Sequence, residues 1–162
     1  MSDQRRRLRR ILDLDGKVAI VTGAAQGLGE ALAHRLGKEG ASVAVADIAD
    51  EKAEAVAQAI AEAYGVRTLW LHTDVTDLSQ TEAMVRRTVE TLGGLDIVIS
   101  NAGIIFAGEI TEIDPALWRK VIEVNLLGYF NVARAAAPIL KSQKSGSIIQ
   151  INSKSGKKGS YK

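Results

Sequence analysis

Short apolar runs alternate with longer helical stretches along almost the whole of this 162-residue chain. The runs are rich in β-branched residues, and the stretches between them carry their apolar residues at helical spacing. Strands joined by such long crossovers must lie parallel, because antiparallel neighbours need only a short turn. The alternation therefore predicts an α/β fold: a doubly wound, Rossmann-like parallel sheet with helices on both faces.

The expected elements follow from these patterns and from the Gly, Pro and Asp residues that punctuate them. The expected strand order is 3-2-1-4-5, which leaves the fifth strand at an edge of the sheet. Gly128 and Pro138 are the places where the last helix is expected to bend or shorten. The expected strands cover residues 17–22, 42–47, 66–72, 95–100 and 146–152, and the expected helices cover residues 27–39, 50–63, 77–92 and 114–140.

The composition excludes several classes of protein. The chain contains no cysteine and two histidines, so we expect no disulfide framework, no thiolate chemistry and no metal site. No apolar run approaches the roughly 20 residues of a membrane-spanning helix. Asp13 and Asp15 stand where the apolar core of a signal peptide would be, so the expected location is the cytoplasm.

The two ends of the chain are basic and its body is acidic. Residues 1–10 carry five Arg and one Asp, and residues 141–162 carry six Lys and no acidic residue. An acidic body is not typical of a nucleic-acid-binding protein. The arginine run at the start either contacts phosphate or anionic lipid, or belongs to a solvated extension over residues 1–15.

A glycine-rich turn separates the first expected strand from the first expected helix. Its sequence, Thr22-Gly23-Ala24-Ala25-Gln26-Gly27-Leu28-Gly29, has glycines at the spacing G-x-x-x-G-x-G. Gly23 permits the tight turn, Gly27 lets the backbone approach a pyrophosphate, and Gly29 permits close packing of helix on strand. The helix N-terminus offers N–H groups and a partial positive charge to phosphates, so the turn predicts a dinucleotide site.

Asp47 ends the second expected strand, 24 residues after Gly23. A carboxylate in this position can accept hydrogen bonds from both hydroxyls of an adenosine ribose, and it would repel a 2′-phosphate. The alternative is that Asp47 caps the following helix, but Asp50 fits the cap position better. No Lys or Arg adjoins Asp47 in the sequence, so we expect NAD in preference to NADP.

The Thr22–Gly29 turn resembles the cofactor signature of the short-chain dehydrogenase/reductase family. Four further features follow in the family's order, over residues 16–156: Asp74-Val75, Asn101-Ala102-Gly103, Asn125 and Ser153. The resemblance implies that residues 16–162 form an NAD(P)-binding domain. The cofactor-binding residues that it implies are Gly23, Gln26, Gly27, Leu28, Gly29, Asp47, Asp74, Val75, Asn101, Ala102 and Gly103.

Two residues receive catalytic roles from the resemblance. Ser153 would hold a substrate oxygen, and Asn125 would hold a water in the proton relay. The residues themselves leave alternatives open: Ser153 as a turn serine, Asn125 as a buried side chain that bonds backbone groups, and Asn101-Ala102-Gly103 as a plain left-handed turn.

The family's catalytic Tyr and Lys fall at positions 166 and 170 in this register, beyond Lys162. Tyr161 follows Ser153 by only eight residues and has no Lys four residues later, so it is not assigned the catalytic role. The expectation is an NAD-dependent oxidoreductase, incomplete at its C-terminus, whose own activity is left open. The alternative is an inactive, truncated nucleotide-binding module that associates with another chain.

The expected reaction is alcohol or polyol oxidation, or carbonyl reduction, by hydride transfer. The octapeptide Gln150–Lys157 resembles bacterial polyol dehydrogenases, especially those that act on sorbitol 6-phosphate. The expected partners are a dinucleotide, a small alcohol, polyol or carbonyl substrate in the full-length family, and further copies of the chain in a homo-oligomer. We expect neither nucleic acid nor a membrane among them.

Overall fold

The computed structural model describes residues 13–106 and 108–153. The arginine run, most of the expected N-terminal extension, and Tyr161 lie outside these described residues.

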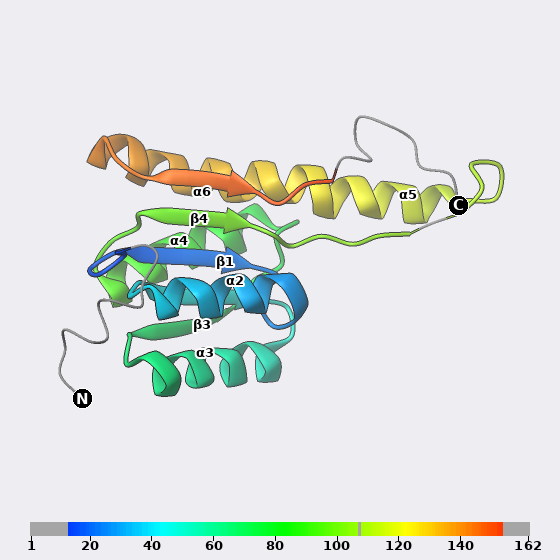
Figure 1. Cartoon of the computed structure of the whole chain (residues 1–162). Coiled ribbons are helices and arrows are strands. Elements are labelled where there is room, and N and C mark those ends of the chain that lie inside the picture. Colours follow the sequence, from blue (N-terminus) through cyan, green and yellow to red (C-terminus); the bar gives the residue numbers. More distant parts are fainter. Residues whose placement is uncertain (1–12, 107, 154–162) are drawn as a thin grey trace.

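Five parallel strands form one sheet in the order β3-β2-β1-β4-β5, as the sequence predicts. All the strands end at the same edge, which we call the carboxyl edge, and the strand order reverses there between β1 and β4 (Figure 1). Such a reversal is where open α/β sheets bind ligands. The strands are β1 (Val18–Thr22), β2 (Ser42–Asp47), β3 (Thr68–His72), β4 (Ile97–Ser100) and β5 (Ser147–Gln150).

Successive residues of a strand point to opposite faces of the sheet, so the apolar strands place side chains on both faces. Helices cover each of these faces. Helices α2 (Gly27–Lys38) and α3 (Asp50–Tyr64) pack over one core, which includes Val43 and Val45 of β2. Helices α4 (Leu78–Leu92) and α6 (Gly128–Gln143) pack over the other, which includes Ala44 of β2. The expected doubly wound, Rossmann-like fold is confirmed.

The expected helix over residues 114–140 is divided by a π-helical turn. Helix α5 (Pro115–Ile122) leads into η1 (Glu123–Leu127), and η1 leads into α6. The expected interruption falls at Gly128, directly after η1, whereas Pro138 does not shorten the helix. Gly128 is the first residue of α6 and lies close to the core, since a Cβ there would be 2.6 Å from Val75 Cγ2. Helix α6 continues through Pro138 to Gln143.

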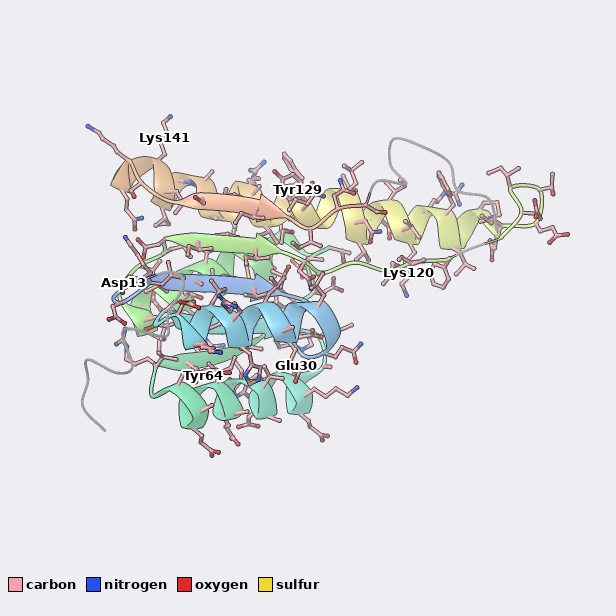
Figure 2. The ribbon with its side chains drawn as sticks, viewed as in Figure 1. Asp13, Glu30, Tyr64, Lys120, Tyr129 and Lys141 are labelled. Carbon is pink, nitrogen blue, oxygen red and sulfur yellow. The ribbon has the colours of Figure 1, made fainter. Side chains whose placement is uncertain are left out.

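Helix α5 extends beyond the carboxyl edge of the sheet and has no buried residue (Figure 1). Lys120 and Lys141, labelled in Figure 2, lie near opposite ends of the rod that α5, η1 and α6 form.

No helix in residues 13–106 and 108–153 is long and apolar enough to cross a membrane. Large apolar side chains of the rod are exposed, namely Leu117, Trp118, Ile122, Leu126, Leu127 and Phe130.

Replacement of Ile60 tests how much the α2–α3 face of the sheet depends on α3. Ile60 is fully buried in that core. We expect Ile60→Ala to lower the free energy of unfolding by about 2–5 kcal/mol, because a buried aliphatic side chain is lost and a cavity remains. Urea denaturation followed by circular dichroism measures the change. The control Gln58→Ala, at an exposed position of α3, should stay within about 0.5 kcal/mol of the wild type, and an equal effect of both changes would contradict the prediction.

Candidate functional site

The glycine-rich turn between β1 and α2 is closed by contacts that exclude side chains. A Cβ on Gly29 would lie 2.1 Å from Gly23 O and 2.5 Å from Asn101 Nδ2. A Cβ on Gly23 would lie 2.7 Å from Ala102 Cα, and Gly23 has φ +62°. Gly27 also has φ +62°, but a Cβ there would meet nothing within 4 Å. Gly23 and Gly29 therefore permit close packing, whereas Gly27 supplies a left-handed backbone beside open space.

The N-terminus of α2 lies open at the carboxyl edge. Gln26 is its N-cap residue, and its side chain makes no capping hydrogen bond. The bond from Glu30 N–H to Gln26 O opens the helical ladder, so the N–H groups of Gly27, Leu28 and Gly29 precede it. Leu28 is 58% exposed. Free N–H groups, the positive end of the helix dipole and the open space at Gly27 fit a pyrophosphate.

Asn101 fastens the end of β4 to the end of β1. Its Nδ2 donates hydrogen bonds to Thr22 O at 3.1 Å and to Gly23 O at 3.0 Å. The N–H groups of Asn101 and Ala102 both donate to Thr22 Oγ1, at 3.1 and 3.2 Å. The side chain of Asn101 is thus bound to the protein, which leaves the backbone of Asn101-Ala102-Gly103 to approach a ligand. The alternative of a left-handed turn is wrong, because none of the three has a positive φ.

Thr22 has a structural role in the site, which the sequence analysis did not assign although it placed Thr22 at the start of the turn. It is fully buried, and its hydroxyl is the common acceptor for the N–H groups of Asn101 and Ala102, which directly follow β4. The available signal was a hydroxyl residue directly before the first glycine of the turn.

The carboxylate of Asp47 joins the end of β2 to the glycine-rich turn. Oδ2 accepts a hydrogen bond from Ala25 N–H at 2.9 Å, and Oδ1 accepts one from Ala49 N–H at 3.0 Å. Each carboxylate oxygen has a second lone pair, so Asp47 can still accept the hydroxyls of a ribose. The expectation that Asp50 caps α3 is wrong: Ala49 is the N-cap residue, and Asp50 Oδ1 lies 2.6 Å from His72 Nδ1.

The Asp74-Val75 pair follows β3 and is held by its own turn. Asp74 Oδ1 accepts hydrogen bonds from the N–H and the hydroxyl of Thr76, at 2.9 and 2.8 Å. Asp74 N–H donates to Gln80 Oε1 at 2.9 Å. Val75 is 6% exposed and its side chain packs in the core against Gly128. Any contact of Val75 with a ligand would therefore come from its backbone.

Asn125 lies in η1 and faces the chain segment that follows β4. Its Nδ2 donates to Ile104 O and its Oδ1 accepts from Ile104 N–H, both at 2.9 Å. The bonding to backbone groups that the alternative expected is confirmed, although the side chain of Asn125 is half-buried rather than buried. Its own carbonyl oxygen accepts a hydrogen bond from Gln150 Nε2 of β5 at 3.4 Å, a contact that the sequence analysis missed.

Ser153 is exposed at the carboxyl edge, three residues beyond the end of β5. Its N–H donates to Asn152 Oδ1 at 2.7 Å. Gln150, in the same strand, supplies the hydrogen bond that joins β5 to η1. Ser153 and Asn125 thus belong to two segments that Gln150 brings together. Within residues 13–106 and 108–153, no three His, Asp or Glu side chains gather as a metal site requires.

Gly29→Ala tests the packing of α2 on the end of β1. The new Cβ would meet a backbone oxygen of Gly23, which cannot move without opening the turn. We expect the free energy of unfolding to fall by about 1–3 kcal/mol, as in other overpacked interiors. Gly94→Ala is a matched control, because a Cβ there meets nothing within 4 Å. Chemical denaturation of both variants measures the difference, and equal stability of the two would refute the packing argument.

Asp77, the N-cap of α4, gives the structure an acid-dependent contact. Asp77 accepts hydrogen bonds from the hydroxyl of Ser79, from the backbone N–H of Ser79 and from the backbone N–H of Gln80. These bonds lower the pKa of Asp77 from its ordinary value of 3.8. Because the pKa of Asp77 is lower in the folded state, the carboxylate stabilises the fold at pH values above its pKa in the unfolded chain. This stabilisation is lost as the pH falls through the pKa of the folded state. We expect the wild type to be more stable than Asp77→Asn at neutral pH. Thermal melts from neutral pH to about pH 2 should show the difference shrinking, and a constant difference would contradict this.

Comparisons with known proteins agree with this geometry. Residues 17–162 match the family model described as short chain dehydrogenase, whose members are oxidoreductases that use nicotinamide dinucleotides. A cis-4-hydroxycyclohexanecarboxylate dehydrogenase from Sinomonas cyclohexanicum is 41% identical over 138 residues, which cover 85% of this chain and 55% of the relative. A 3-alpha-(or 20-beta)-hydroxysteroid dehydrogenase from Mycobacterium bovis is 39% identical over 146 residues, which cover 90% and 55%.

The structural comparison leads to the same family. A short-chain type dehydrogenase/reductase from Mycobacterium marinum superposes with a TM-score of 0.88 at 34% identity, over 93% of this chain and 61% of that one. The chain spans a little more than half the length of the curated relatives described above, 55% in each case. The family model matches residues 17–162, and the sheet and the glycine-rich turn agree with it. This chain therefore belongs to the short-chain dehydrogenase family.

Proposed function

We propose that this chain binds NAD and supports hydride transfer between the dinucleotide and a secondary alcohol or the corresponding ketone. The observation that carries the proposal is the junction of the open α2 N-terminus with the Asp47 carboxylate through Ala25, at the carboxyl edge of the sheet. The relatives whose names specify a hydroxycyclohexane or a hydroxysteroid act on ring compounds with hydroxyl groups, which favours a secondary alcohol. The expected likeness to polyol dehydrogenases stays a prediction.

The proposed binding mode assigns each part of the dinucleotide to one part of the edge. The N–H groups of Gly27, Leu28 and Gly29 would receive the pyrophosphate. Asp47 would accept the hydroxyls of the adenosine ribose. The adenine would lie beside Asp74 and the Val75 backbone, and the close turn at Asn101-Ala102-Gly103 would let the rest of the dinucleotide cross β4.

The proposed chemistry needs few polar groups from the described part of the chain. A bound nicotinamide would supply the hydride donor or acceptor. Ser153 would hold the substrate oxygen through its hydroxyl. A serine hydroxyl is not an efficient general acid near neutral pH, so we assign Ser153 to orientation rather than to proton transfer. Asn125 is held in place by the bonds from its side chain to Ile104, and its backbone carbonyl oxygen also accepts from Gln150 Nε2. The second lone pair of that oxygen would position a water for the proton relay.

Titration with NADH and NADPH tests the cofactor proposal directly. We expect tighter binding of NADH, because Asp47 would repel a 2′-phosphate. Asp47→Ala should weaken NADH binding by roughly 1.5–3 kcal/mol, through the loss of charge-assisted hydrogen bonds to the ribose. Its effect on NADPH should be smaller. Dinucleotide fluorescence gives the dissociation constants.

Asp50→Ala is the matched control for this experiment. Asp50 is an exposed carboxylate three residues after Asp47, and it pairs with His72 rather than with the glycine-rich turn. We expect its dissociation constant for NADH to stay near that of the wild type. Tighter binding of NADPH by the wild-type protein would contradict the proposed preference.

A further inference from the structure

A lysine of α3 reaches the glycine-rich turn. Lys52 lies in the first turn of α3, and its Nζ donates a hydrogen bond to Gln26 Oε1 at 3.2 Å. The two residues are 26 positions apart in the sequence, so only the fold brings them together. Gln26 makes no capping bond to its own helix. Its side chain is used instead to hold an exposed ammonium group beside the turn.

Lys52 and Asp47 act on adjacent residues of that turn. Asp47 Oδ2 accepts from Ala25 N–H at 2.9 Å, and Lys52 Nζ donates to the side chain of the next residue, Gln26. A carboxylate and an ammonium group are thus both attached to the same short stretch of the turn, at Ala25 and Gln26. The sequence analysis found no cation adjoining Asp47, because Lys52 is five residues away along the chain and lies near the turn only after α3 has formed.

Lys52 is the basic residue in the first turn of α3, and its neighbours there are acidic, so an anion at this point would bind to Lys52. Asp50 is 2.6 Å from His72 Nδ1, on the side of β3. Asp50 and Glu51 are acidic and would not attract a phosphate. The acceptor that Lys52 meets at Gln26 is a neutral amide oxygen, and a charged phosphate oxygen is a stronger acceptor for an ammonium group.

We propose that Lys52 is a specificity-determining residue for the 2′ position of the adenosine ribose, and that it lets the site accept NADP beside the favoured NAD. This inference rests on the proposed binding of a dinucleotide. With NAD, Lys52 stays on Gln26. With NADP, its ammonium group moves to the 2′-phosphate and offsets part of the repulsion from Asp47. The side chains of Lys52 and Gln26 are exposed, so the contribution of Lys52 to NADP binding is moderate and is screened by salt.

The test compares dissociation constants for NADH and NADPH, by dinucleotide fluorescence at low and high ionic strength. Lys52→Met removes the charge and keeps an unbranched apolar stem, and Lys52→Arg keeps the charge. We expect Lys52→Met to raise the dissociation constant for NADPH about three- to tenfold and that for NADH less than about twofold. The difference should shrink at high salt, and Lys52→Arg should restore most of the NADPH affinity.

Lys38→Met is the matched control, since Lys38 is an exposed lysine in the last turn of α2, at the opposite end of that helix. It should change neither dissociation constant. If Lys52→Met leaves the ratio of the two constants unchanged, or weakens both dinucleotides equally, Lys52 has a structural role and the inference is overturned while the proposed function stands. If the wild-type protein binds neither dinucleotide, the proposed function fails and the inference fails with it.

Discussion

The close approach of α2 to the ends of β1 and β4 is the constraint on which the candidate site depends. Gly29 lies against the backbone of Gly23, and the Asn101 amide donates hydrogen bonds to the carbonyl of Thr22, the last residue of β1, and to that of Gly23. Because a single methyl group at Gly29 would overlap a carbonyl oxygen, the helix can begin at this distance only with glycine. That distance sets where the first N–H groups of α2 lie, and hence where a phosphate would meet them.

Polar side chains at the carboxyl edge mainly hold backbone segments in place. Asn101 binds β1, Asn125 binds Ile104, and Asp47 binds both the glycine-rich turn and the start of α3. Groups whose hydrogen bonds are already made inside the protein reorganise little when a ligand arrives. In the proposed site, the atoms that meet the dinucleotide are therefore chiefly backbone N–H groups, supplemented by the free lone pairs of Asp47. Such a site is rigid before binding, which lowers the entropic cost of holding a ligand.

The sequence predicts the parts of this structure that repeat a local pattern. Strand order, the helices on both faces and the sterically required Gly23 and Gly29 all follow from periodicity and from the chemistry of a strand–turn–helix unit. The misses are contacts between side chains and distant segments. Asp50 has the residue type of a helix cap, but His72, at the end of the neighbouring strand β3, holds it. Lys52 has no local feature that points to Gln26, because that contact exists only once α2 and α3 lie side by side on the sheet.

The π-helical turn η1 shows why periodicity fails where two packing demands conflict. Asn125 must face Ile104 to bind its backbone, whereas Gly128 must face Val75 so that α6 can lie close to the core. A regular α-helix would fix the angle between these two residues by its 3.6-residue turn. A π turn, closed here by the bond from Gly128 N–H to Glu123 O, holds more residues per turn and so rotates α6 relative to α5. Helical spacing alone does not predict this π turn within residues 114–140, because the contacts on either side of it come from the segment after β4 and from the turn after β3.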